Sequence, residues 1–134
     1  MREIKFRIWD EEEHKMERAL AVDWFFKTAI TSANPVTNSH PRGVSFRDKD
    51  EILMQYTGMK DQTGREIYEG DIVKFISRLD DSKRMGTVRY WAGDATFLIE
   101  CEREIFFLFH DALNREVIGN IYENPELVSN EADT

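Results

Sequence analysis

Apolar and polar residues alternate along several short stretches of this chain, and a period of two is typical of β-strands that bury one face. Residues 4–9 read Ile-Lys-Phe-Arg-Ile-Trp and predict a strand. A polar turn over 10–14 and a return strand over 16–22 complete a predicted N-terminal hairpin. The aromatic segment 23–26 fits either a further strand or a buried loop, because periodicity does not separate the two.

Glycines punctuate the second half of the chain. Gly58, Gly64 and Gly70 each stand where a strand would have to turn, and glycine readily adopts the positive φ that such turns use. Gly119 predicts a bulge or a close approach of two backbones. The predicted strands of this half are 52–56, 72–76, 86–91 with 95–100 (the clearest hairpin), 105–109 (a buried strand) and 116–122.

Residues 28–50 are the longest stretch without periodicity, and they include Pro35 and Pro41. Loops of this length are uncommon in compact domains unless they are functional or disordered, so this segment is the best candidate for a mobile loop. Near the C-terminus, the sequence predicts at most one helical turn over 125–128, followed by an acidic tail over 129–134.

These patterns together predict an all-β fold, partly closed like a barrel, with at most short helical turns. The 134 residues are expected to form a single domain over 1–128. A chain of this length buries roughly 70% of the surface that its unfolded form exposes, which is enough for a real core.

The net negative charge of the chain arises in its last third. Residues 90–134 contain 2 basic and 10 acidic side chains and carry a net charge of −8, which equals the net charge of the whole chain. Such a field repels phosphate backbones and argues against a sequence-independent grip on nucleic acid.

No stretch of sequence indicates export or membrane insertion. No run approaches the roughly 18 apolar residues that a membrane span needs. The N-terminal residues 1–7 alternate charge with apolar side chains and lack the apolar core of a signal peptide. We therefore expect a cytoplasmic protein with no membrane partner.

The residue types that carry catalysis are sparse. Cys101 is the only cysteine, so an internal disulfide and a multi-cysteine zinc site are excluded, and we interpret it as a buried structural residue. His14, His40 and His110 lack the spacing of paired metal ligands. No phosphate-binding glycine loop or nucleophile elbow occurs. The sequence predicts no enzyme and no cofactor.

One acidic corner offers the best candidate for chemistry. Glu66, Glu69 and Asp71 cluster around Gly70. Paired carboxylates can bind magnesium or share acid and base roles. They can equally keep a turn soluble and cap backbone N–H groups, and we favour this structural interpretation.

Five residues are weak candidates for a nucleic-acid site. Arg78, Lys83, Arg84 and Arg89 can form a small basic patch, and Tyr90 can offer a ring for stacking bases, as on other small barrels. A solvated loop and hairpin face explains the same charges more simply. Most aromatic residues in an all-β domain of this size also belong to the core or to cross-strand pairs.

Three blocks of sequence stand out by their order and spacing. They read Lys-Phe-Arg-Ile-Trp-Asp at 5–10, the glycine-punctuated block at 53–73, and Glu-Val-Ile-Gly-Asn-Ile-Tyr-Glu-Asn-Pro-Glu-Leu at 116–127. In this arrangement the chain resembles the YopX family of phage and prophage proteins. The motif residues that carry the resemblance are Trp9, Gly58, Asp61, Gly64, Tyr68, Glu69, Gly70, Asp71, Gly119, Asn120, Tyr122 and Pro125.

The resemblance implies an all-β fold with a bifurcated, barrel-like sheet, whose central part is similar to small SH3-like barrels. It also implies a phage or prophage setting in a bacterial host cell. No activity or cofactor is established for the family, so no functional residue carries over. We expect a phage accessory protein that acts as a non-catalytic binding or assembly module, on an unidentified protein partner or on copies of itself. The alternative is a small-barrel nucleic-acid-binding protein in phage replication or regulation.

Overall fold

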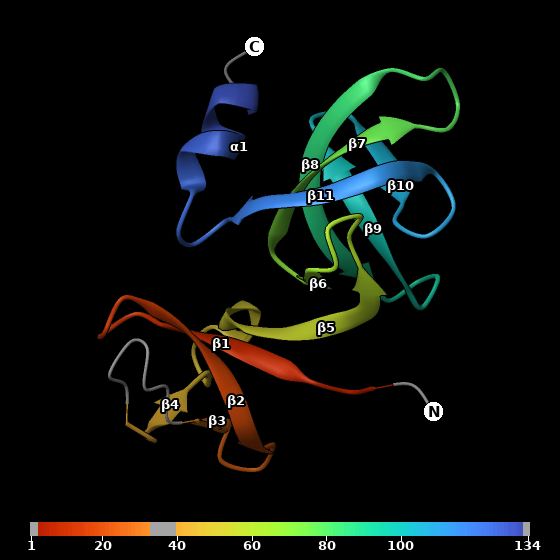
Figure 1. The fold of residues 1–134 in the computed structure, drawn as a ribbon. Coiled ribbons are helices and arrows are strands. Elements are labelled where there is room, and N and C mark those ends of the chain that lie inside the picture. Colours follow the sequence, from red (N-terminus) through yellow and green to blue (C-terminus); the bar gives the residue numbers. More distant parts are fainter. Residues whose placement is uncertain (1–2, 33–39, 133–134) are drawn as a thin grey trace. The chain divides into compact units, whose positions relative to one another are not determined.

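The computed structural model describes residues 3–32 and 40–132, and it confirms the all-β prediction. The chain forms two compact units, Met1–Tyr56 and Thr57–Thr134. Nearly all regular structure is antiparallel β-strand, in one sheet of six strands and one of five (Figure 1). The resemblance to the YopX family implies one bifurcated, barrel-like sheet; among the described residues the strands form two sheets, and neither closes into a barrel. The single domain over 1–128 stays a prediction.

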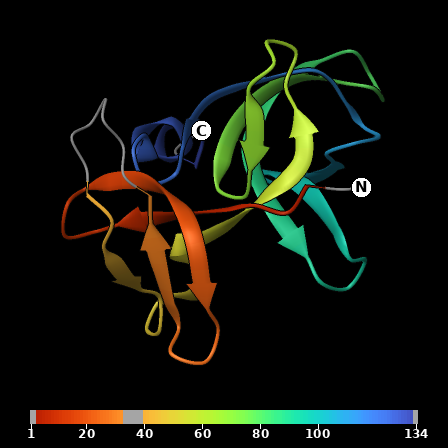
Figure 2. The same ribbon diagram turned by 60° about the horizontal axis from the view of Figure 1, so that its bottom comes forward.

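The first unit is built on the predicted N-terminal hairpin. Its elements are β1 (Phe6–Asp10), β2 (Lys15–Asp23), β3 (Thr28–Thr31), β4 (Gly43–Ser45), a 3-10 turn (Asp50–Ile52) and the start of β5 (Leu53–Lys60). The strand order is β4-β3-β2-β1-β5-β6, so β5 continues from the sheet of the first unit to β6 of the second. Figure 2 shows β2 and β3 as antiparallel neighbours joined by a tight turn.

Two predictions in the first unit are wrong. The segment 23–26 is neither a further strand nor a buried loop: Asp23 ends β2, and residues 24–26 lie in the exposed turn between β2 and β3. The segment 28–50 is not irregular throughout, because β3 and β4 lie within it and pair with each other and with β2. These strands have only four and three residues, too few for a period of two to stand out. The mobile loop predicted here falls partly on residues 33–39, which lie outside the described residues.

The second unit contains β6 (Glu66–Tyr68), β7 (Asp71–Ser77), β8 (Lys83–Trp91), β9 (Thr96–Cys101), β10 (Glu104–Phe107) and β11 (Ala112–Asn120). Five of these strands form the sheet β10-β9-β8-β7-β11. The predicted hairpin of 86–91 with 95–100 is confirmed, with Val88 opposite Ile99. Both lie in the core of this unit, together with Val73, Phe75 and Phe106. Burial of these apolar side chains supplies the main force that holds the sheet in its curved form.

The apolar run 105–109 is buried on one face only, contrary to the prediction of a buried strand. Phe106 and Leu108 enter the core, whereas Ile105, Phe107 and Phe109 are exposed. The density of apolar residues hid the alternation, because both faces of this short strand carry apolar side chains.

The C-terminal helix is longer than predicted. It runs as α1 (Pro125–Ala132), with proline at its first position as expected. The predicted tail therefore begins with helix, and only residues 133–134 lie outside the described residues. No glycine or proline follows Pro125 to stop the helix. Within the described ranges, no helix is long and apolar enough to cross a membrane.

Candidate interaction surfaces

The glycine-punctuated block at 53–73 forms a frame of strands and tight turns. Gly58, Gly64 and Gly70 have φ angles of 87°, 91° and 84°, which side-chain-bearing residues rarely adopt. Gly64 and Gly70 stand at turns as predicted, but Gly58 lies inside β5, near the boundary between the two units. The three glycines are thus explained by backbone geometry.

Asp61 is the hydrogen-bonding centre of this frame. Its Oδ1 atom accepts from the N–H of Thr63 at 2.9 Å, from the Thr63 hydroxyl at 2.7 Å and from the N–H of Arg65 at 3.0 Å. Its Oδ2 atom accepts from the N–H of Val117 in β11 at 2.8 Å. Burial opposes ionisation of this carboxyl, yet the hydrogen bonds prevail and hold its pKa below the ordinary value. Asp61 therefore ties the 60–64 turn to the edge of the sheet.

The acidic corner at Gly70 has a structural arrangement. The buried Asp71 carboxylate accepts from the N–H of Tyr68 at 2.8 Å, and the Tyr68 hydroxyl donates to Glu66 at 3.2 Å. Gly70 itself donates to the carbonyl of Val88 at 2.9 Å. Glu69, the third carboxylate, also has an interaction partner. In the part of the chain that the structure describes, no group of three or more His, Cys, Asp or Glu side chains is placed to hold a metal ion.

The last motif block closes the turn that leads into α1. The Asn120 side-chain oxygen accepts from the N–H groups of Tyr122 at 3.0 Å and Glu123 at 2.8 Å. The Asn124 side-chain oxygen accepts from the N–H of Asn120 at 3.1 Å and would overlap a Cβ placed on Gly119. The predicted bulge at Gly119 is confirmed by a shift of register between Val117 and Gly119.

His14, His110 and Cys101 have structural surroundings. Trp9, the first motif residue, is buried, and its ring contacts that of His14 with centroids 4.9 Å apart. Cys101 lies in the core of the second unit. His110 is an exposed turn residue whose Nδ1 atom lies 2.9 Å from Asp111. That hydrogen bond, opposed by desolvation, holds the pKa of Asp111 below its ordinary value.

Asp111 also covers part of the sheet edge. Its carboxylate accepts from the N–H of Phe107 at 3.1 Å, and its own N–H donates to the Phe107 carbonyl at 2.9 Å. Phe107 ends β10, an outer strand of the five-stranded sheet. Capping the main chain of an edge strand hinders pairing with another strand.

The five weak nucleic-acid candidates do not form one patch. Four are on β8, where successive side chains point to opposite faces. Lys83 and Arg89 therefore lie on one face, and Arg84 and Tyr90 on the core-facing side. Arg78 is in the turn between β7 and β8.

Arg84 is also occupied. It donates to Glu104 at 2.8 Å and to the Ser82 hydroxyl at 2.9 Å, and its guanidinium lies 5.6 Å from the centre of the Phe106 ring. The hydrogen bond to Glu104, reduced by burial, raises the pKa of Arg84. The positive charge of Arg84 is thus paired with an acidic side chain of the same chain.

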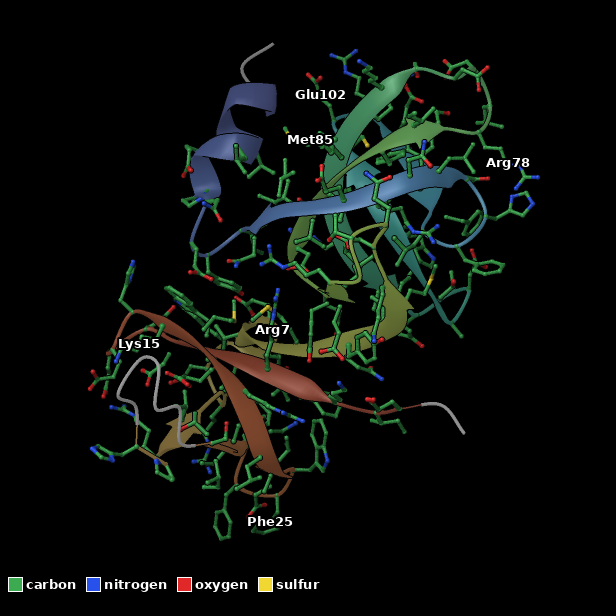
Figure 3. The ribbon with its side chains drawn as sticks, viewed as in Figure 1. Arg7, Lys15, Phe25, Arg78, Met85 and Glu102 are labelled. Atoms are coloured by element: carbon green, nitrogen blue, oxygen red, sulfur yellow. The ribbon has the colours of Figure 1, made fainter. Side chains whose placement is uncertain are left out.

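Two adjoining hollows lie along β8 and β9 and are here called the β8–β9 groove. The larger, of 490 Å³, extends over Lys83, Met85 and the β9–β10 turn. The smaller, of 290 Å³, is bounded by Arg89, Glu100, Ile121 and Val128 of α1. Cys101 and Glu102 line both hollows. Figure 3 shows Met85 and Glu102 at this part of the second unit.

The first unit displays aromatic side chains at its β2–β3 turn, residues 24–27, here called the aromatic tip. Phe25 is 84% exposed and Phe26 is 58% exposed. Figure 3 shows Phe25 projecting away from the end of the hairpin. Their rings contact each other edge to face, with centroids 4.9 Å apart.

The aromatic tip is held in a defined conformation. The Asp23 carboxylate accepts from the N–H groups of Phe25 and Phe26, both at 3.0 Å. Trp24 packs between the rings of Phe6 and Phe46, with centroids 5.6 Å and 6.0 Å away. The exposure of Phe25 and Phe26 was not predicted from the sequence, because the apolar residues of 23–26 suggested a strand or a buried loop. One signal for an exposed turn was nevertheless present. That signal was Asp23 at the start of a tight turn, where aspartate caps the following N–H groups.

Comparison with known proteins shows the family of the chain. The family model described as YopX protein matches residues 5–129. The chain is similar to the crystal structure of protein EF1440 from Enterococcus faecalis, with 28% sequence identity and a TM-score of 0.57, over 96% of this chain and 99% of that chain. No match was found among curated proteins. Because the family model covers nearly all of its length, this chain belongs to the YopX family.

Proposed function

We propose that this protein is a non-catalytic binding module that holds a partner protein through its aromatic tip. The observation that carries the proposal is the display of Phe25 and Phe26 at a turn whose backbone is fixed by Asp23. Large apolar side chains that remain exposed on a rigid element mark interaction sites more often than scattered surface residues do.

The tip has the physical properties of a binding anchor. Phenylalanine has only two side-chain torsions, so ordering it in a complex costs little conformational entropy. Trp24, packed between Phe6 and Phe46, restricts the tip before any partner arrives. Less freedom is then lost on association. The fitting partner is a protein with a concave apolar pocket that takes the two rings.

The wider setting follows from the family. The YopX resemblance supports an accessory protein of a phage or prophage, acting in the cytoplasm of the bacterial host. A non-catalytic role is supported by the acidic corner, where Asp71 and Glu66 are engaged by Tyr68.

The alternative, a nucleic-acid-binding protein of phage replication or regulation, has less support. Lys83 and Arg89 lie on the face of β8 opposite Arg84, and Arg84 is paired with Glu104. A phosphate backbone laid along the β8–β9 groove would meet the Glu100, Glu102 and Glu104 carboxylates.

A capture experiment tests the proposal. Tagged wild-type protein and the double variant Phe25→Ala/Phe26→Ala are used to retain proteins from a phage-carrying host lysate. We expect a partner that the wild type retains and the double variant loses, with each ring contributing about tenfold in affinity. The matched control is Phe109→Ala, which removes an equally exposed phenylalanine from the second unit.

The outcomes separate the alternatives. A protein retained equally by wild type and Phe25→Ala/Phe26→Ala would not use the tip, and the proposal would be wrong. Retention of nucleic acid, abolished by Lys83→Glu/Arg89→Glu but not by the tip variant, would favour the alternative function. Both tip residues are exposed, so their loss is expected to leave the unfolding midpoint unchanged.

A further inference from the structure

We propose that the β8–β9 groove is the face on which a second copy of this chain docks, in a two-fold symmetric pair. This inference is independent of the aromatic tip, which belongs to the other compact unit. It rests on the distribution of charge over the groove and on the apolar side chains beside it.

The groove carries charges of both signs that have no partner among the described side chains. Lys83, Arg89 and Arg103 supply three cations, and Glu100 and Glu102 supply two carboxylates. Among the side chains that the structure describes, within 3–32 and 40–128, none of these five forms an ion pair or a side-chain hydrogen bond. By contrast, the neighbouring Arg84 and Glu104 are joined to each other at 2.8 Å.

Charges of both signs on one face match the requirement of a two-fold pair. In such a pair, if one residue meets a second residue on the partner copy, the same rotation returns the reciprocal contact. Arg89 lies on β8, whereas Glu102 lies in the turn after β9. A rotation that brings Arg89 of one copy onto Glu102 of the other therefore forms two ion pairs.

The net charge of the chain favours this face over others. Two copies, each with a net charge of −8, repel each other. All of this net negative charge belongs to residues 90–134. In the groove three cations accompany two carboxylates, so repulsion between copies is weaker there than over the acidic remainder of this unit. A basic partner protein would be attracted to the acidic remainder of this unit, but it would meet Lys83, Arg89 and Arg103 in the groove.

Apolar side chains beside the groove can be buried between the two copies and so stabilise the contact. Ile105 pairs with Glu100 across the strands, and Phe107 pairs with Leu98, so both side chains extend from the face of β9 that carries Glu100. Ile105 and Phe107 are about half exposed. Interfaces between identical chains combine such apolar residues with a charged rim.

Reciprocal charge reversal provides a sharp test. Sedimentation velocity and native mass spectrometry would be applied to the full chain and to two variants, Arg89→Glu/Arg103→Glu and Glu100→Arg/Glu102→Arg. We expect the wild type to dimerise and each variant alone to associate at least about tenfold more weakly, because like charges then face each other. An equimolar mixture of the two variants should restore the pair as a mixed dimer. Arg78→Glu, in the β7–β8 turn, is the control that should leave dimerisation unchanged.

Three results would overturn the inference. A wild type that remains monomeric at every concentration has no such interface. Variants that dimerise as well as the wild type place the contact elsewhere on the molecule. Two monomeric variants that do not associate when mixed lack the reciprocal contacts. A circular dichroism spectrum and urea midpoint like those of the wild type establish that each variant is folded. Phe25→Ala/Phe26→Ala should dimerise like the wild type, so this test and the capture experiment fail independently.

Discussion

The backbone N–H of Val117 donates to the Oδ2 atom of Asp61 at 2.8 Å, although the two residues are 56 positions apart in the sequence. The other carboxylate oxygen of Asp61 organises the turn that contains Thr63 and Arg65. Next to this bond, the N–H of Gln62 donates to the carbonyl of Arg115 at 2.9 Å. A single buried carboxylate thus fixes a local turn and attaches it to β11.

Replacing Asp61 with asparagine should destabilise the protein. The amide has one acceptor oxygen where the carboxylate has two, so either Val117 or the turn loses its acceptor. Because Asp61 is only 6% exposed, water does not replace the bond, and we expect a loss of about 1–3 kcal/mol in the free energy of unfolding. Urea denaturation measures this loss. Asp94→Asn makes the same chemical change at an exposed position and should have no effect; equal losses in both variants would contradict the role of Asp61.

The same carboxylate predicts a dependence of stability on pH. The pKa of Asp61 in the folded state is below its ordinary value of 3.8, because its hydrogen bonds outweigh the cost of burial. Its stabilising contribution is therefore complete above about pH 4 and is lost as the pH falls through the folded-state pKa. Urea midpoints measured from neutral to acidic pH should fall less steeply below pH 4 in Asp61→Asn than in the wild type. Parallel curves for the two proteins would show that Asp61 does not contribute.

The sequence was sufficient for those elements whose hydrophobic pattern extended over five or more residues. The N-terminal hairpin and the hairpin of β8 with β9 were predicted because alternation and turn residues agreed. The short strands β3 and β4 were not, since their pairing with β2 comes from tertiary contacts rather than from local pattern. The continuation of α1 to Ala132 was missed for a related reason: an acidic composition suggested a tail although it is compatible with a helix.

Candidate surfaces were harder to predict than strands. The structural interpretation of the Gly70 corner agrees with the hydrogen bond between Asp71 and Tyr68, because a capping carboxylate next to a glycine turn is a local arrangement. The β8–β9 groove depends on register, which places residues of β8 next to residues 100–102. Nothing in a single sequence states this register. Lys83 and Arg84 also precede the predicted strand 86–91, so their placement on opposite faces of β8 became visible only in the folded chain.

Gly119 should tolerate no side chain while Asn124 is present. A Cβ at this position would overlap the Asn124 carboxamide, whose Cγ atom would be only 2.7 Å away. Since such an overlap forces the turn to shift, Gly119→Ala is expected to cost about 1–3 kcal/mol of stability. In the Asn124→Ala background the same substitution should cost clearly less, because the obstructing group has been removed. A double-mutant cycle in urea measures this coupling, and strictly additive losses would refute it.

Arg42 should stabilise the first unit through a buried acid. Its Nε atom lies 3.1 Å from the Oδ2 atom of Asp10, which is only 1% exposed, and its other nitrogens contact Glu12 and Glu13 at 2.8 Å and 2.9 Å. Removing the guanidinium in Arg42→Ala leaves the Asp10 charge buried without a cation, so we expect the urea midpoint to fall. Asp10→Asn/Arg42→Ala should recover part of the loss, because the uncompensated charge is gone. Lys49→Ala, which breaks the exposed pair of Lys49 with Glu11 at 2.7 Å, is the control and should leave the midpoint unchanged. If the double variant is less stable than Arg42→Ala alone, the hydrogen bonds that the Asp10 carboxylate accepts from the N–H groups of Glu12 and Glu13, rather than its pairing with Arg42, determine the stability of this turn.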